Sequence, residues 1–156
     1  MSAEPSEADE YWMRRAIELS RLCPPSETAF SVGAVIVDAD GNEIANGYSR
    51  ETDPHVHAEE SALAKLAADD ARLSSATIYS TLEPCAKRRS RPQTCTELIL
   101  AAGIPRVAIA WREPDVFVTD VDGVEILRAS GATVVELPTL SANAREVNVH
   151  LPGIVP

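Results

Sequence analysis

The sequence has few basic residues: 14 lysines and arginines stand against 24 aspartates and glutamates, which gives a formal net charge of −10. A protein that binds the phosphate backbone of a nucleic acid over a broad surface needs a basic face. The composition therefore disfavours a nucleic-acid partner, although a local basic patch could still bind one small anion.

The sequence also lacks the segments that mark membrane and secreted proteins. No apolar run reaches the length of a transmembrane helix, and residues 1–10 have neither the basic nor the apolar region of a signal peptide. We therefore expect a cytoplasmic protein with no membrane partner. A chain of 156 residues is most simply one domain over residues 1–156, with residues 1–6 and 152–156 as frayed ends.

Cysteine is scarce, since the chain has only three. So few cysteines in a chain of this kind favour metal ligands over disulfide bonds. Cys85 and Cys95 flank a basic stretch and are the candidate ligands. Cys23 ends a helix-like run just before two prolines, and we expect it only to pack against its neighbours.

A candidate metal site combines this cysteine pair with His57-Ala58-Glu59. One imidazole and two thiolates are good zinc ligands, and a catalytic zinc site leaves its fourth position to water, whereas a structural site is normally closed by four protein ligands. Three ligands beside a carboxylate therefore predict one catalytic Zn²⁺ per chain, held by His57, Cys85 and Cys95. Glu59 would then move protons during the reaction.

Taken alone, each residue of the histidine motif has a plainer interpretation. A single histidine in the first turn of a helix is usually a surface or capping residue, and Glu59 could be a solvated first-turn acid. Because Cys85 and Cys95 follow later in the chain, the metal site is the favoured interpretation for both His57 and Glu59. His55 is expected to form part of a pocket wall, because a fourth protein ligand would displace the water.

Strands alternate with helices along most of the sequence, which predicts an α/β fold. We expect a three-layer α/β/α sandwich around a central five-stranded mixed sheet. The expected strands are residues 32–37, 43–48, 77–81, 106–110 and 133–137, and the expected helices are residues 7–22, 57–68, 94–103, 121–130 and 138–150. Ligands of open α/β sheets bind in crevices at the carboxyl ends of the strands, where both motifs lie.

The start of one helix can be predicted to a single residue. Thr94 is followed three positions later by Glu97 and then by the apolar run 98–100, which is the pattern of a capping box. Thr94 should therefore be the N-cap, and Cys95 the first helical residue. The positive end of the helix dipole favours the thiolate of Cys95, the form that zinc requires. Gly103 should end this helix.

These motifs, His57-Ala58-Glu59 with Pro84-Cys85 and Cys95, resemble those of the cytidine-deaminase-like superfamily of zinc-dependent deaminases. Within it, the chain is most similar to the deaminase domain of the bifunctional riboflavin-biosynthesis enzyme, which also has a long gap between its two cysteines. The resemblance covers residues 11–151, and nothing in the chain corresponds to the reductase domain of that enzyme. It implies zinc ligation by His57, Cys85 and Cys95, and at least a homodimer.

The resemblance also suggests residues that bind the substrate. It implies that the backbone of Ala58 and the carbonyl side of Glu83 hold the ring and its amine. The loop before His57 departs from the riboflavin enzyme and is similar to transfer-RNA adenosine and guanine deaminases, which makes Ser49 and Asp53 candidates. Phe30 could stack on a base, or it could belong to the core.

The gap between the cysteines is basic, with Lys87, Arg88, Arg89 and Arg91. These residues could bind a substrate phosphate at the rim of the pocket. The alternative is a solvated loop that has no ligand. A loop between two metal ligands is held close to the site, so the two interpretations carry about equal weight.

The sequence thus predicts a zinc-dependent hydrolytic deaminase that releases ammonia from an amino-substituted pyrimidine or a related nucleobase or nucleotide. A diaminopyrimidine ribosyl phosphate of the riboflavin pathway leads among the substrates, ahead of cytidine, deoxycytidylate and guanine. The alternative from another class is a non-enzymatic, zinc-stabilised interaction module. Glu59 argues against such a module, because no carboxylate is needed there to hold the metal.

Overall fold

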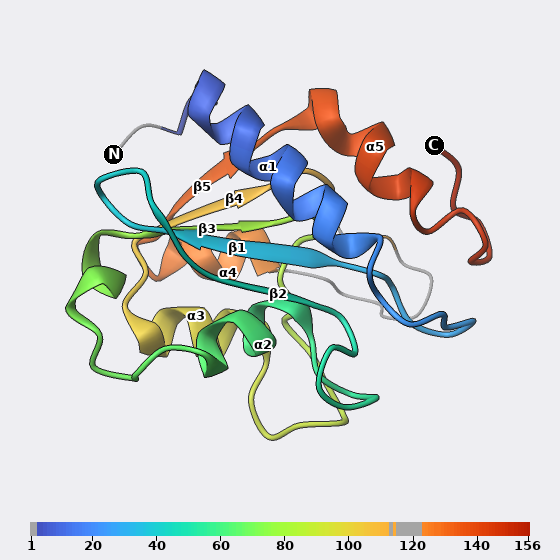
Figure 1. Cartoon of the computed structure of the whole chain (residues 1–156), viewed down its shortest axis with the longest axis horizontal. Helices are drawn as coiled ribbons and strands as arrows, with labels where there is room; N and C mark the ends of the chain where they lie inside the picture. The colour runs from blue at the N-terminus through green and yellow to red at the C-terminus, as the bar shows by residue number, and fades with distance from the viewer. Residues whose placement is uncertain (1–2, 113, 115–122) are drawn as a thin grey trace.

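The computed structural model describes residues 3–112, 114 and 123–156, and within them the chain forms one five-stranded sheet (Figure 1). The order of the strands is β2-β1-β3-β4-β5, with bounds Gly33–Val37 (β1), Glu43–Tyr48 (β2), Thr77–Ser80 (β3), Arg106–Ile109 (β4) and Thr133–Glu136 (β5). Strand β1 pairs antiparallel with β2 and β3, whereas β3, β4 and β5 are parallel. The predicted mixed sheet is confirmed.

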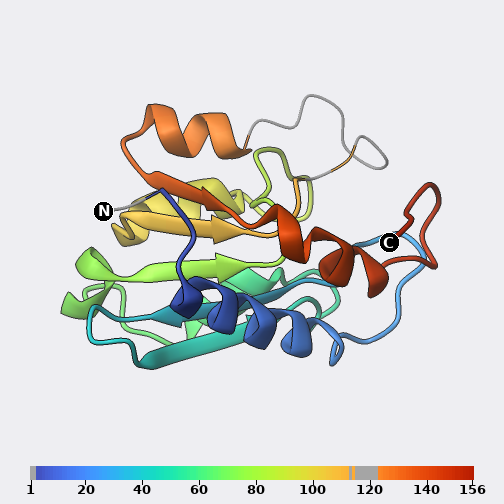
Figure 2. The ribbon, with the colours of Figure 1, turned by 90° about the horizontal axis from the view of Figure 1, so that it is seen from above.

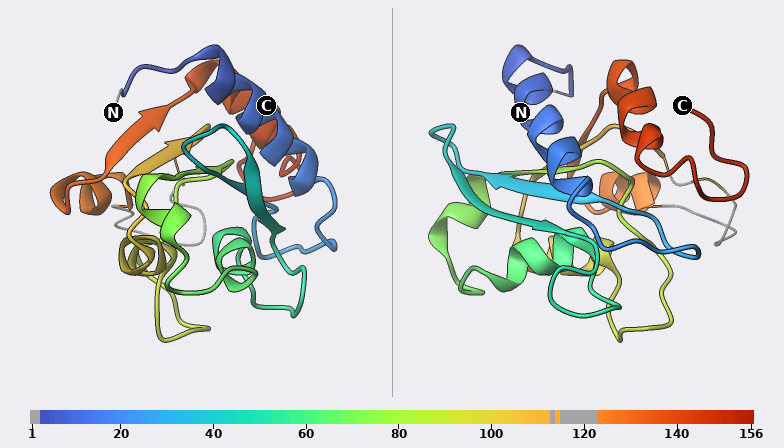
Figure 3. Two further views of the ribbon diagram at one scale, coloured as in Figure 1. Left: turned by 60° about the vertical axis from the view of Figure 1, so that its left-hand side comes forward. Right: turned by 45° about the vertical axis from the view of Figure 1, so that its right-hand side comes forward.

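Helices of the described part cover both faces of the sheet (Figures 2 and 3). On one face lie α1 (Glu7–Ser20) and α5 (Ser141–Glu146), and on the other lie α2 (Ala58–Ala64), α3 (Cys95–Ala102) and α4 (Gly123–Ala129). Two short 3₁₀ helices, Ala71–Ser75 and Pro138–Leu140, complete the described elements. The three-layer α/β/α arrangement is therefore as predicted.

The layers follow from the alternation of side chains along fully buried strands. In β1, Val35 and Val37 join the cluster that contains the buried face of α1, whereas Ala34 and Ile36 join the cluster that contains Ala58 and Ala62 of α2. The sheet thus separates two hydrophobic cores, and the core on the side of α2 and α3 lies beneath the candidate metal ligands.

A buried ion pair anchors the first helix to the middle of the sheet. The Asp9 carboxylate accepts hydrogen bonds from both terminal nitrogens of Arg106, at 2.7 Å each, and from the Tyr79 hydroxyl at 2.6 Å. Burial alone would raise the pKa of Asp9, but these hydrogen bonds outweigh it and hold the pKa well below its usual range. The charge of Asp9 thus links α1 to β3 and β4.

We expect Asp9→Asn to lower the free energy of unfolding at pH 7 by about 3 kcal/mol, because it removes the carboxylate that compensates the largely buried Arg106 guanidinium. The folded-state pKa of Asp9 is depressed, so its contribution is complete above the unfolded-state pKa of about 4 and is lost as the pH falls further. Urea unfolding should show that the loss of unfolding free energy caused by Asp9→Asn is smaller by about 1 kcal/mol at pH 3 than at pH 7.

The exposed Asp40 in the β1–β2 turn provides a matched control. Asp40→Asn should change the free energy of unfolding by less than about 0.5 kcal/mol at either pH. If Asp9→Asn lowers the free energy of unfolding by the same amount at pH 7 and pH 3, the ionised carboxylate is not what stabilises the fold.

At each end of the chain, some residues predicted to fray make specific contacts, and the fraying itself stays a prediction. Ser6 is the N-cap of α1: its hydroxyl accepts from the Asp9 backbone N–H, and its own N–H donates to the Asp9 carboxylate. At the other end Ile154 is buried, and Arg145 donates to the backbone carbonyl of Val155. Side-chain capping and burial therefore order residues that composition alone assigned to tails.

Three predicted helices are shorter in the structure. The first ends at Ser20, the helix predicted for residues 57–68 ends at Ala64, and the one predicted for 138–150 is a 3₁₀ turn followed by α5. After Ala64, Lys65 Nζ donates to the Asn46 carbonyl at 2.7 Å. After α5, the buried Asn148 amide bonds to both backbone groups of Ser31. These long-range contacts lie just beyond the ends of α2 and α5, and a local pattern does not contain them.

The predicted helix over residues 121–130 is observed as α4, with residues 121 and 122 lying outside the described residues. None of the helices in the described part of the chain is both long enough and apolar enough to cross a lipid bilayer.

Candidate metal centre and its cavity

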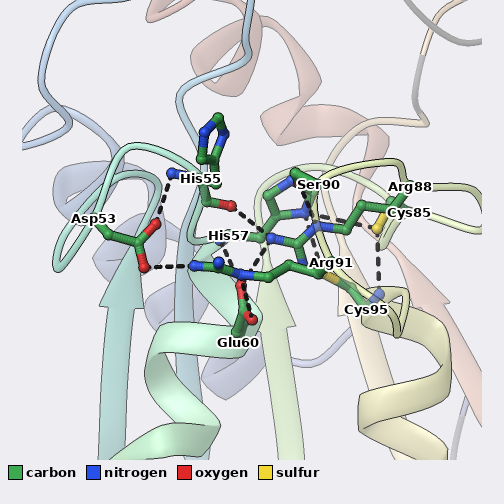
Figure 4. Close-up of polar contacts among 9 residues, drawn as sticks. All are labelled: Asp53, His55, His57, Glu60, Cys85, Arg88, Ser90, Arg91 and Cys95. Atoms are coloured by element: carbon green, nitrogen blue, oxygen red, sulfur yellow. Dashed lines mark hydrogen bonds and ion pairs between the residues drawn. The ribbon is translucent and has the colours of Figure 1, made fainter.

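Three side chains with metal-binding atoms meet at one edge of the sheet. His57 is the N-cap of α2, Cys85 follows β3, and Cys95 is the first residue of α3. His57 Nδ1 lies 3.3 Å from Cys95 Sγ and 3.6 Å from Cys85 Sγ, and all three donor atoms lie within 4.8 Å of one another (Figure 4). Among the described residues this is the one group of three or more that could hold a metal ion.

The spacing of these atoms fits a tetrahedral zinc site. Zinc binds thiolate sulfur at about 2.3 Å and imidazole nitrogen at about 2.0 Å, so a tetrahedral angle places the two donors about 3.5 Å apart. The two observed sulfur–nitrogen distances lie on either side of this value. The site offers three donors, which leaves one tetrahedral position for another ligand.

The start of α3 places both thiols as the sequence predicted. Thr94 is the N-cap, its hydroxyl accepts from the Glu97 backbone N–H, and the Glu97 carboxylate accepts from the Thr94 N–H, so the capping box is confirmed. The backbone N–H of Cys95 donates to Cys85 Sγ at 3.2 Å. The first turn of α3 thus provides one ligand and hydrogen-bonds the other.

The two thiols influence each other strongly. A hydrogen bond from Cys95 and the neighbouring His57 lower the pKa of Cys85. The hydrogen bond to Cys85 and complete burial raise the pKa of Cys95. One thiolate and one thiol therefore share a proton, and a metal ion that binds both sulfurs would displace it.

The start of α2 is closed by a second capping box. The backbone N–H of His57 donates to the Glu60 carboxylate at 3.2 Å. This cap holds His57 in an extended conformation, with φ −90° and ψ 160°, so that its ring turns toward the two sulfurs.

Gly47 of β2 allows α2 to lie against the sheet. A Cβ at Gly47 would come within 2.6 Å of both the Ala58 carbonyl oxygen and the Ala62 nitrogen, and these backbone atoms cannot rotate away. We expect Gly47→Ala to lower the free energy of unfolding by about 3 kcal/mol. Because α2 carries His57, zinc affinity should fall as well, and competition with a chelator would measure it. Unchanged zinc affinity would show that α2 can shift without moving His57.

Glu59 lies beside the metal group in an almost completely buried position, 4% exposed. Burial raises the pKa of Glu59 to about 7, and the positive charge of a protonated His57 opposes that rise. A carboxyl group with a pKa near neutrality can both accept and donate a proton under physiological conditions. The structure therefore places a carboxyl group that can exchange protons at neutral pH next to the three metal-binding side chains.

A cavity of about 270 Å³ opens over this group. Its walls come from residues between 28 and 32, between 49 and 59, and between 82 and 90, so both metal-binding loops contribute. The predicted site residues that line it are Phe30, Ser49, His57, Ala58, Glu59, Glu83, Cys85, Lys87 and Arg88, and His55 also belongs to the wall. The cavity is large enough for one small ring compound.

Several of these lining residues are already engaged with the protein. The Ser49 hydroxyl accepts from the Val32 backbone N–H at 3.0 Å, and the Glu83 carboxylate accepts from the Val124 N–H at 2.7 Å. The Phe30 ring packs edge-on against Trp111, with the ring centres 5.5 Å apart. These contacts shape the cavity, and the substrate-binding roles of the three residues remain predictions.

Four predicted site residues lie outside the lining: the metal-ligand candidate Cys95 and the substrate-binding candidates Asp53, Arg89 and Arg91. Asp53 and Arg91 form an ion pair with each other, and Arg91 also pairs with Glu60 at 3.3 Å. Arg89 is exposed on the loop. The basic stretch between the cysteines is therefore divided, with only Lys87 and Arg88 facing the cavity.

Arg50 lines the cavity but was missed in the sequence. It has a left-handed backbone conformation, with φ 62°, and among the described residues it is the one non-glycine residue with positive φ. Its guanidinium donates to the carbonyls of Pro24 and Phe30, which fixes the loop that carries Phe30. An arginine gives no local signal for this conformation, because its backbone is determined by these distant carbonyls.

Comparisons with known proteins agree with this geometry. Residues 6–111 match the family model described as the cytidine and deoxycytidylate deaminase zinc-binding region. The diaminohydroxyphosphoribosylamino-pyrimidine deaminase of Schizosaccharomyces pombe is 40% identical over 129 residues, which cover 81% of this chain and 31% of the relative. The riboflavin biosynthesis protein RibD of Aquifex aeolicus is 36% identical, covering 91% of this chain and 38% of its own. The chain spans about a third of the length of these curated relatives.

Solved structures give the same result. Acinetobacter baumannii RibD, form 2, aligns with a TM-score of 0.77 and 33% identity, over 91% of this chain and 38% of that one. Aspergillus oryzae Rib2 deaminase, solved in complex with DARIPP, aligns with a TM-score of 0.77 and 25% identity over 90% of each chain. The resemblance inferred from the sequence motifs is confirmed.

Proposed function

The chain belongs to the cytidine and deoxycytidylate deaminase family, and from this premise we propose that it is a zinc-dependent hydrolytic deaminase acting on an aminated pyrimidine. One observation carries the proposal: three metal-binding atoms within 4.8 Å of one another lie beside the buried Glu59, at the base of a cavity. A metal that only stabilised the fold would need neither the carboxylate nor the cavity.

In this proposal His57, Cys85 and Cys95 hold one zinc ion per chain. Zinc bound there would lower the pKa of water in its open fourth position toward neutrality. Glu59 would accept a proton from water and deliver protons to the ring nitrogen and to the leaving amine. Its burial supports this role, because a carboxyl group with a pKa of about 7 loses and regains a proton easily at neutral pH.

The cavity walls would hold the ring in place for this proton transfer. Ala58 and Glu83 line the cavity, and in this proposal the Ala58 backbone and the carbonyl side of Glu83 would hold the ring and its amine. Phe30 offers an apolar wall on the loop held by Arg50. Exclusion of bulk water by these walls would strengthen each hydrogen bond to the substrate.

The relatives favour a particular substrate class. Several carry names of the riboflavin pathway, and one is named for a diaminohydroxyphosphoribosylaminopyrimidine. We infer that this chain deaminates such a diaminopyrimidine ribosyl phosphate. A homodimer is part of the proposal on resemblance alone, and light scattering of the purified protein would test it. The cytoplasmic location is proposed from the sequence features described above.

The proposal is tested by measuring ammonia release from purified, zinc-loaded protein. The panel contains the diaminopyrimidine ribosyl phosphate, cytidylate, deoxycytidylate, their unphosphorylated forms, cytosine, guanine and adenine. We expect turnover of the diaminopyrimidine phosphate to exceed that of every other compound. Preferential turnover of deoxycytidylate or guanine would move the enzyme to another branch of the family. No ammonia from any member of the panel would contradict the assignment as a deaminase of these substrates.

A further inference from the structure

The cations between the two cysteines differ sharply in their exposure. The Arg88 side chain is only 3% exposed, whereas that of Arg91 is 31% exposed and both Lys87 and Arg89 are exposed. Arg88 is also part of the cavity wall. A nearly buried guanidinium that borders a substrate cavity requires acceptors on the side facing the protein and on the side facing the cavity.

The protein supplies acceptors for part of this guanidinium. Nη2 of Arg88 donates to the His55 carbonyl and, at 2.8 Å, to the Glu60 carboxylate, while Nε donates to the Ser90 hydroxyl at 3.1 Å (Figure 4). Glu60 also accepts from the backbone N–H of His57. These bonds fix the position of Arg88 against the loop that carries His57.

Nη1 of Arg88 is left without an acceptor. Across the part of the chain that the structure describes, it is the one buried side-chain nitrogen or oxygen that has no hydrogen-bond partner. Buried polar groups are almost always paired, because desolvating a donor without a new bond is unfavourable, and the penalty is larger for a charged group. An acceptor that arrives with the ligand would remove this penalty on binding.

We propose that Nη1 of Arg88 donates a hydrogen bond to the oxygen substituent on the pyrimidine ring of the substrate, and so determines which aminated ring is accepted. This inference rests on the proposed function and adds a specificity residue to it. The name of the Schizosaccharomyces pombe relative includes both a hydroxyl group on the pyrimidine and a phosphate, and either oxygen could in principle accept.

Burial distinguishes the ring oxygen from the phosphate. Lys87 is an exposed cation in the same cavity wall and offers the phosphate a partner that solvent also reaches. Arg88 is closed off from solvent and its other nitrogens are held rigidly, which suits a single oxygen of a flat ring. A site built to bond one oxygen strongly rejects a ring that lacks it, since the donor then stays buried and unpaired.

The test measures binding, so that its result does not depend on turnover. Dissociation constants are determined by calorimetry on zinc-loaded protein carrying Glu59→Gln, with and without Arg88→Lys. The ligands are the diaminohydroxypyrimidine ribosyl phosphate, its analogue with hydrogen in place of the ring oxygen, and both compounds without phosphate. Arg14→Lys, at an exposed position of α1, is the matched control, and zinc content is measured for every protein.

With Arg88 intact, we expect the ring oxygen to strengthen binding by roughly 10- to 100-fold. Arg88→Lys should reduce that preference to less than about threefold, with and without the phosphate, while zinc content stays unchanged. Arg14→Lys should retain the full preference. A preference that survives Arg88→Lys would overturn the inference, as would a preference that is absent from the unsubstituted Arg88 protein. An effect of Arg88→Lys seen only with the phosphorylated pair would instead assign Arg88 to the phosphate.

Failure of the proposed function gives a different result. It would appear as absence of ammonia release from protein that retains Glu59, whatever the binding preference. If ammonia release is retained and the preference for the ring oxygen does not depend on Arg88, only the specificity role of Arg88 is lost and the proposed function stands.

Discussion

Glu59→Gln should lower ammonia release by about 10³-fold while zinc content and thermal stability stay close to those of the unsubstituted chain. Glutamine fills the same buried space but can neither accept a proton from water nor return one to the leaving amine. Because Glu59 is buried beside the ligands and is not one of them, its loss should affect the chemistry and leave the metal in place. Ammonia release under saturating substrate, with zinc measured on the same samples, gives the comparison.

The exposed Glu10 of α1 offers a matched substitution, and Glu10→Gln should retain full activity. Activity of Glu59→Gln within about tenfold of the unsubstituted chain would show that Glu59 does not carry the proton. A zinc-stabilised interaction module would show no turnover in the unsubstituted chain, and Glu59→Gln would change neither its zinc content nor its stability.

Cys95→Ser should reduce bound zinc from about one ion per chain to a small fraction. It replaces a thiolate that begins α3 with a neutral hydroxyl, which zinc binds weakly. Because bound metal stabilises only the folded state, we expect the free energy of unfolding in excess zinc to fall by about 4 kcal/mol. Metal analysis after dialysis and urea unfolding with and without zinc measure the two effects.

Cys23 gives the control for this cysteine. Its sulfur lies 3.5 Å from the Val32 carbonyl oxygen and is not part of the metal group, so Cys23→Ser should retain zinc and lose less than about 1 kcal/mol. Full zinc occupancy in Cys95→Ser would mean that the ligand set differs from the one inferred here.

Features that depend on neighbouring residues could be predicted well from the sequence. The capping box at Thr94 placed Cys95 at the first helical position, and the structure agrees to the residue. The β1–β2 hairpin was also bounded closely, because a buried apolar run and a polar turn of residues 38–42 are both local signals. The ligand types and the adjacent carboxylate were sufficient to identify a zinc-site candidate.

Features that depend on distant contacts could not be predicted in this way. No local pattern contains the bond from Lys65 to β2 just beyond the end of α2, or the bonds from Arg50 to carbonyls twenty or more residues away. The four cations between the cysteines looked equivalent in the sequence. Ion pairs with Asp53 and Glu60 turn Arg91 away from the cavity lining and hold Arg88 within it.

The order of the strands has a consequence for how the site forms during synthesis. All three metal-binding residues and Glu59 precede β4 in the chain, so they leave the ribosome before the parallel half of the sheet exists. At that stage β3 presents an unpaired edge next to two reactive thiols, and an unpaired edge invites association with other chains. Early capture of zinc would shield the thiols, but only the arrival of β4 closes the edge. Between the emergence of Cys95 and that of Ile109 from the ribosome, a nascent chain therefore exposes both an unpaired strand edge and two reactive thiols.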